Sequence, residues 1–117
     1  METAGMMLRK PPYGDINAAE AVRHALGAVS DDLKVMLFLV DGGVMLAKKG
    51  HDESGTGFTN LEGALRDCID MGVEVYAESG SMREQELDPS EMAEGVKVIA
   101  PNELSAMVQE VDTLMIF

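Results

Sequence analysis

The residue types best suited to chemistry gather in one stretch, residues 72–85 (GVEVYAESGSMREQ). The pattern predicts a strand over residues 73–77 and a helix after it. Ser81 and Glu84 have the spacing of a capping box, which predicts that the helix begins at Ser81. Ligands of open α/β sheets bind beyond the carboxyl ends of the strands. Glu78, in the predicted turn, therefore lies where chemistry is expected.

Two other segments follow predicted strands, around Tyr13 and around Asp41. The carboxyl ends of parallel strands share one edge of the sheet, so we expect one binding rim. The rim would contain Tyr13, Gly14, Asp41, Gly42, Glu78, Ser79 and Ser81. A small ligand on this rim is one interpretation. The alternatives are a tight strand-to-helix turn at Asp41-Gly42-Gly43 and a solvated turn carboxylate at Glu78.

The chain has a single cysteine, Cys68. It falls on the apolar stripe of a predicted helix, together with Leu61, Ala64, Leu65 and Met71. A thiol in apolar surroundings stays protonated and inert, so we expect Cys68 to be buried packing. A cysteine at position 78 would instead lie beside the amides of a helix start, which lower a thiol pKa. Glu78 in that place could act as a base or bind a basic group.

Several common sites have no support in the sequence. There is no GxGxxG and no GxxxxGK[ST] pattern, so a nucleotide site is not expected. His24 and His51 have no partners at metal-ligand spacing, so neither is expected to bind a metal. We therefore expect no metal and no cofactor.

The charge of the chain limits its partners. Its 21 acidic and 9 basic residues give a formal net charge of −12, which disfavours direct binding to nucleic acids and to anionic membranes. No apolar run approaches the ~20 residues of a membrane span. The first residues lack the apolar core of a signal peptide, and one cysteine suits a reducing compartment. We expect a cytoplasmic location.

Strand and helix patterns alternate along the chain, which predicts one domain over residues 1–117. We expect a three-layer α/β/α fold with a five-stranded, mainly parallel sheet, flavodoxin-like or Rossmann-like. Predicted strands cover 4–8, 33–40, 73–77, 96–99 and 113–117. Predicted helices cover 15–28 (capped by Asp15 or Asn17), 44–47, 60–71 (capped by Thr59 or Asn60), 81 onward, 89–95 and 102–110, with a flexible loop over 48–60.

Four segments together resemble the DsrE/DsrF-like family, specifically its DsrF/TusC branch. They are KPPYGDINAAEAVRHAL, VMLFLVDGGVMLAKKG, SMREQELDP and VDTLMIF. The resemblance covers nearly the whole chain and implies an α/β/α subunit that assembles into trimers or hexamers. The best-known members pass persulfide sulfur between proteins, for tRNA 2-thiouridine synthesis or for dissimilatory sulfur oxidation.

The resemblance also bears on position 78. In the active DsrE/TusD subunits a cysteine on the loop after the third strand carries the sulfur. Matching YAESGSMRE to that loop places Glu78 at the cysteine position. The resemblance therefore implies a non-catalytic, DsrF/TusC-like subunit that packs against DsrE-like and DsrH-like partners or against copies of itself. The alternative is an enzyme or sulfur carrier that uses Cys68 or Glu78.

Overall fold

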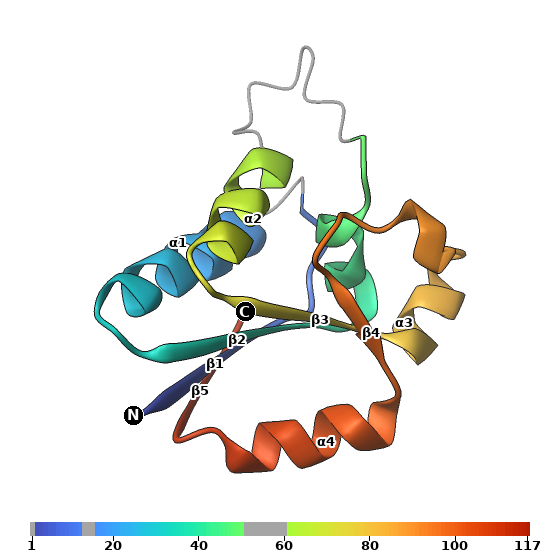
Figure 1. Ribbon diagram of the computed structural model, residues 1–117. Helices are drawn as coiled ribbons and strands as arrows, with labels where there is room; N and C mark the ends of the chain where they lie inside the picture. The colour runs from blue at the N-terminus through green and yellow to red at the C-terminus, as the bar shows by residue number, and fades with distance from the viewer. Residues whose placement is uncertain (1, 13–15, 51–60) are drawn as a thin grey trace.

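A parallel sheet of five strands forms the centre of the computed structural model, which describes residues 2–12, 16–50 and 61–117 (Figure 1). All four neighbouring pairs of strands are parallel, and their order is β4-β3-β2-β1-β5. The predicted α/β class with a five-stranded parallel sheet is confirmed. The strands are β1 (Thr3–Leu8), β2 (Lys34–Leu39), β3 (Glu74–Glu78), β4 (Lys97–Ile99) and β5 (Thr113–Ile116).

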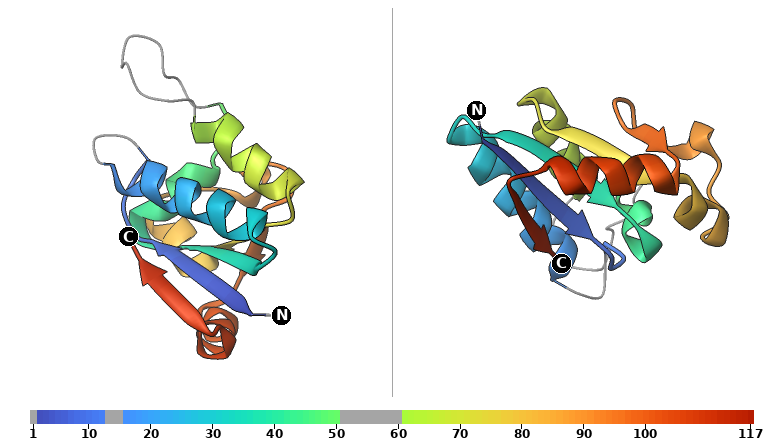
Figure 2. Two further views of the ribbon diagram at one scale, coloured as in Figure 1. Left: turned by 90° about the vertical axis from the view of Figure 1, so that its left-hand side faces the viewer. Right: turned by 90° about the horizontal axis from the view of Figure 1, so that it is seen from below.

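Helices cover both faces of this sheet. The helices α1 (Asn17–Ser30) and α2 (Leu61–Asp70) lie on one face, and α4 (Pro101–Glu110) lies on the other (Figures 1 and 2). Right-handed crossovers explain this division, because the chain steps across the sheet in one direction from β1 to β4 and then returns to β5 beyond β1. The short elements η1 (Asp41–Ala47), α3 (Ser79–Glu84) and η2 (Pro89–Glu91) follow β2 and β3.

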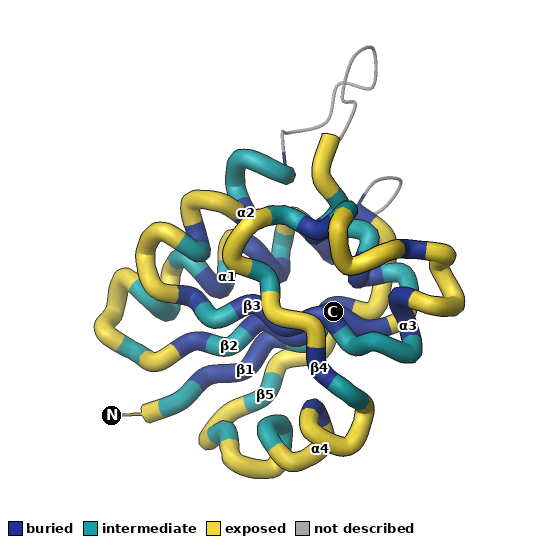
Figure 3. Tube along the Cα trace, turned by 45° about the vertical axis from the view of Figure 1, so that its right-hand side comes forward, coloured by how far each residue is buried: buried dark blue, intermediate teal, exposed yellow. Residues whose placement is uncertain are grey.

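The alternation of side chains along β2 fills two separate cores. Val35, Leu37 and Leu39 belong to the large core beneath α1 and α2, whereas Phe38 belongs to a smaller core beneath α4. Because both faces of β2 are covered, its sequence is apolar almost throughout. Figure 3 shows the resulting burial, with dark central strands and a mostly exposed α4.

Three predicted helices differ from the structure. The helix predicted over 44–47 is the 3₁₀ helix η1, which begins at Asp41. The helix after β3 begins at Ser79 rather than Ser81. The helix predicted over 89–95 is only the single 3₁₀ turn η2. The helix stops there because the backbone of residues 91–93 forms hydrogen bonds with residues 47–49 instead. The Ala93 N–H donates to the Ala47 carbonyl, and the Lys49 N–H donates to the Glu91 carbonyl. These bonds replace those that would extend a helix.

The predicted ends of the first helix were also wrong by a few residues. Helix α1 runs to Ser30, and its N-cap is Ile16, which makes no side-chain capping bond. Asn17 is thus the first helical residue rather than the cap. Asp15, the other predicted cap, and Thr59 and Asn60, predicted for α2, lie outside the described residues, as does most of the predicted 48–60 loop. Within the described ranges, no helix is long and apolar enough to cross a membrane.

Candidate functional site

Glu78 is the last residue of β3 and the N-cap of α3. Its side chain folds back, and its Oε1 accepts a hydrogen bond of 3.0 Å from the Ser81 N–H. A carboxylate is favoured there because the first amides of a helix have no partner within the helix. The prediction that Ser81 caps the helix was therefore wrong: Ser81 is the residue that is capped.

Ser81 is buried and connects two strand ends. Its Oγ accepts a hydrogen bond of 2.8 Å from the Asp41 N–H, which follows β2. Asp41 has φ +50°, a left-handed conformation that non-glycine residues rarely adopt. The Asp41 carboxylate in turn lies 3.3 Å from Nε of Arg9, at the end of β1. The structure thus brings Asp41, Glu78 and Ser81 of the predicted rim together.

The glycines at 42 and 43 are explained by close packing against the end of β1. A Cβ on Gly43 would lie 2.1 Å from the Leu8 carbonyl oxygen. A Cβ on Gly42 would lie 3.0 Å from the Pro11 ring. Gly43 needs glycine to let the backbone approach, whereas a Cβ on Gly42 would require the Pro11 ring to shift by a few tenths of an ångström. Both glycines belong to the 3₁₀ helix η1 rather than to a turn before it.

Ser79 faces a different region from Asp41. It borders a hollow of about 230 Å³ together with Met82, Leu87 and Val98. Tyr13 and Gly14, the remaining predicted rim residues, lie outside the described part of the chain. Among the described rim residues, the polar groups of Asp41, Glu78 and Ser81 bind one another.

A second hollow lies where the strand order reverses, between the carboxyl ends of β1 and β5. It has a volume of about 360 Å³ and is lined by Arg9, Lys10, Asp41, Ile116 and Phe117. Such a reversal is the usual ligand crevice of an open α/β sheet. The signal for it in the sequence was the adjacent pair Arg9-Lys10 directly after β1. It could be recognised only with the position of β5 known.

Cys68 is fully buried between α2 and α1. Its Sγ lies 3.8 Å from the Val22 carbonyl oxygen, to which the thiol donates. Burial raises the pKa of the Cys68 thiol to about 11, and the neighbouring Asp67 carboxylate adds to the rise. The thiol is therefore protonated at neutral pH. Met71, expected on the same stripe, is half-exposed instead because the helix ends before it.

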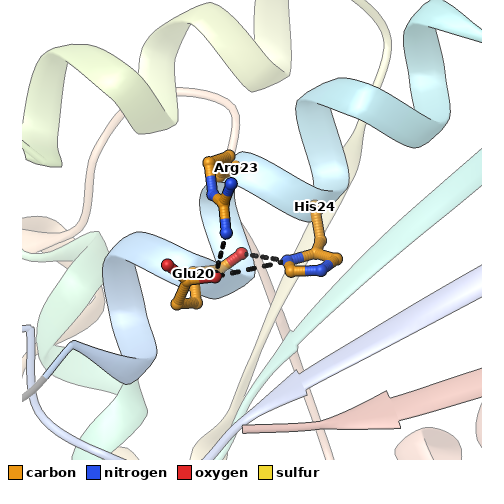
Figure 4. Close-up of polar contacts among 3 residues, drawn as sticks. All are labelled: Glu20, Arg23 and His24. Atoms are coloured by element: carbon orange, nitrogen blue, oxygen red, sulfur yellow. Dashed lines mark hydrogen bonds and ion pairs between the residues drawn. The ribbon is translucent and has the colours of Figure 1, made fainter.

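Figure 4 shows a separate polar group on α1. The Glu20 carboxylate pairs with Arg23 and lies 3.9 Å from Nδ1 of His24. The same nitrogen lies 2.8 Å from the Glu20 carbonyl oxygen, which only accepts, so Nδ1 carries the proton. The His24 ring contacts Phe117 with ring centroids 5.4 Å apart. Among the described residues, no group of three or more potential ligands could hold a metal ion.

The model of the DsrE/DsrF-like family matches residues 4–117. The chain belongs to the DsrE/DsrF-like family. The intracellular sulfur oxidation protein DsrF of Allochromatium vinosum is 31% identical over 87 residues, which are 74% of this chain and 64% of that protein. The sequence resemblance to this family is thereby confirmed.

Two archaeal relatives match at greater length. The uncharacterized protein MK0008 of Methanopyrus kandleri is 31% identical over 96% of this chain and 91% of its own length. The uncharacterized protein MJ0989 of Methanocaldococcus jannaschii is 30% identical over 96% of both chains.

Solved structures show the same fold. The YchN protein of E. coli superposes with a TM-score of 0.90 over the full length of both chains, at 20% identity. Protein MTH1491 of Methanobacterium thermoautotrophicum, of unknown function, superposes with a TM-score of 0.76 over 98% of this chain and 99% of its own, at 13% identity.

Proposed function

We propose that the protein is a non-catalytic, DsrF/TusC-like subunit of a cytoplasmic sulfur-relay assembly. Membership of the DsrE/DsrF-like family relates the chain to sulfur-relay proteins. The observation that carries the proposal is Glu78: at the tip of β3 the chain has a carboxylate, which is bound to the Ser81 amide. The chain supplies its partners with a folded surface rather than with a thiol.

The chemistry of sulfur relay explains why the carboxylate matters. A carrier thiolate attacks the outer sulfur of a donor persulfide; a new S–S bond forms as the old one breaks, and the donor thiolate leaves. The nucleophile must be a thiolate. Glu78 cannot form that bond. Cys68, with a pKa of about 11 and no exposed surface, does not supply the thiolate either.

Assembly with cysteine-bearing relatives would restore the function. We propose DsrE-like and DsrH-like subunits as partners, or copies of this chain in a trimer or hexamer. The relative DsrF is named for intracellular sulfur oxidation. We propose that this chain serves sulfur oxidation or tRNA thiolation. The rim around Asp41, Glu78 and Ser81 remains the alternative as a small-ligand site.

The test is capture of the native assembly followed by a sulfur-transfer assay. The tagged full chain should co-purify with a cysteine-bearing relative from the organism's own extract. With a persulfide donor, intact-mass analysis should show an added sulfur atom on that partner and none on this chain. A sulfur adduct on this chain that Cys68→Ser abolishes would replace the proposal with the carrier alternative. Failure to capture any relative of the family would contradict the proposal.

A further inference from the structure

The two edges of the sheet differ in how they are protected. The edge strand β4 has only three residues, one of which is Lys97, and both features hinder pairing with another strand. The edge strand β5 (Thr113–Ile116, TLMI) has no charge and no proline. Its Met115 and Ile116 are 37% and 62% exposed, and no described strand pairs with its outer side. An uncharged, apolar edge of this kind favours strand addition.

We infer that β5 pairs antiparallel with β5 of a second copy across a twofold axis, which joins the two sheets into one. This inference rests on the self-association named in the proposed function and identifies its surface. Of the trimer and the hexamer named there, only the hexamer contains a twofold axis. A twofold contact uses the same patch on both copies, so the patch must complement itself. The backbone and the charges at β5 both satisfy that condition.

The backbone fixes the register of the pair. The Phe117 N–H donates to the Met7 carbonyl and the Arg9 N–H donates to the Phe117 carbonyl, so Phe117 faces β1 and, by alternation, Leu114 and Ile116 direct their N–H and C=O groups outward. If Leu114 pairs with Ile116 of the second copy, each of these residues both donates and accepts across the contact. Met115 then lies opposite its own copy on the twofold axis, and Thr113 lies opposite Phe117.

Irregular bonding limits the pairing to this short segment. Thr113 is the register partner of Ala4, yet the Asp112 N–H, one residue earlier, already donates to the Thr3 carbonyl. The ladder is therefore irregular at the amino end of β5. Regular pairing with a second copy begins at Thr113.

The charges at the two ends of β5 are complementary. The carboxyl end borders the hollow that contains Arg9 and Lys10, both exposed. The amino end carries Glu110 and Asp112, also exposed. Antiparallel pairing brings the acidic end of each copy to the basic end of the other. In a chain of net charge −12, this arrangement places acidic groups against basic groups rather than against one another.

The first test measures native mass over a concentration series for the full chain and two variants. Met115→Lys places a charge on the β5 edge, and Val98→Lys places the same charge on the β4 edge at a residue of matching exposure, 39%. Melting curves verify that both variants fold. We expect Met115→Lys to have half the native mass of the wild type, and Val98→Lys to have the wild-type mass. A monomeric wild type, or equal masses for both variants, would overturn the inference.

The second test examines the register by cysteine crosslinking in a Cys68→Ser background. Met115→Cys places two thiols at a non-hydrogen-bonded antiparallel pair about 4.5 Å apart between Cα atoms, within the range of a disulfide. Thr113→Cys is the control, because it is also exposed but its two copies would lie about 13 Å apart along the strands. Mild oxidation should crosslink only Met115→Cys. Faster crosslinking of Thr113→Cys would overturn the register.

The outcomes of these tests are separable from those of the proposed function. Capture of a cysteine-bearing relative by Met115→Lys would leave the relay proposal standing even if β5 pairing failed. A dimer of the expected register that captures no relative would support β5 pairing and contradict the relay proposal.

Discussion

At the scale of single residues, Cys68 makes the stability of the protein depend on alkaline pH. The thiol is neutral when protonated, and its pKa is about 11 in the folded state against its ordinary value of 9.0. The contribution of the raised pKa to the free energy of unfolding is fully present below pH 9 and is lost as the pH rises through 11. Two pKa units correspond to about 2–3 kcal/mol of unfolding free energy.

The measurement is urea unfolding of the wild type and Cys68→Ala between pH 7 and pH 11. At neutral pH the wild type should be more stable, because alanine leaves space in the core. That advantage should shrink above pH 9. The raised pKa of Tyr76, whose largest cause is burial, acts equally in both proteins and cancels. A constant difference between the two proteins up to pH 11 would contradict the assigned pKa.

Glu78 and Gly80 form a pair that a double-mutant cycle can test. A Cβ on Gly80 would lie 2.6 Å from Oε1 of Glu78, so Gly80→Ala must displace the capping carboxylate. Alanine in place of a helical glycine gains about 1 kcal/mol, whereas loss of a cap costs about 0.5–2 kcal/mol. Gly80→Ala should therefore be nearly neutral or destabilising alone, but stabilising in a Glu78→Ala background. If the changes in unfolding free energy of the two single variants add up to that of the double variant, the Glu78 carboxylate does not cap α3.

At the scale of elements, α3 is attached to the sheet through Ser81. Ser81→Ala removes the acceptor of the Asp41 N–H and should destabilise the protein by about 1–3 kcal/mol, the cost of an unpaired buried donor. The control is Ser30→Ala, whose hydroxyl donates to the Leu26 carbonyl within α1 at an exposed site. Chemical denaturation should show a clearly smaller effect for the control. Equal losses of stability in the two variants would mean that a water molecule accepts the hydrogen bond from the Asp41 N–H when Ser81 is replaced.

A comparison of β2 with α3 explains why the strands could be predicted from the sequence better than the helix caps. The apolar run of β2 reflects burial on both faces, a property of the strand itself, and it was predicted within a residue or two. The hydroxyl of Ser81 looked like a cap because Glu84 follows at capping-box spacing. Its actual partner is the Asp41 amide, 40 residues away in the chain. Local spacing carries no information about such a contact.

At the scale of the whole molecule, the layers were predictable but the strand order was not. Alternating strands and helices require a sheet covered on both faces. They do not say that β5 lies beyond β1, which depends on where α4 returns across the sheet. The basic hollow at Arg9 and Lys10 and the free edge at β5 both follow from that placement. Both features were therefore missing from the predicted rim.

The net charge of the whole molecule leads to a last prediction, on salt. With 21 acidic and 9 basic residues, repulsion within the folded chain exceeds the attraction of ion pairs such as Arg9–Asp41 and Lys34–Glu74, whose side chains are largely exposed or half-exposed. Raising the NaCl concentration to about 0.3 M shortens the screening length to well under 10 Å. The melting temperature should rise by roughly 4 °C, equivalent to about 1 kcal/mol.

The control lowers the charge without salt, by replacing three exposed carboxylates at Asp31, Asp67 and Glu94 with their amides. Because this variant carries less repulsion to screen, calorimetry at low salt should show a higher melting temperature than the wild type, and added NaCl should raise it less. Both proteins must be measured at the same low concentration, since pairing through β5 would add its own stability as copies associate. A melting temperature that falls with NaCl would mean that the few ion pairs outweigh the excess of carboxylates.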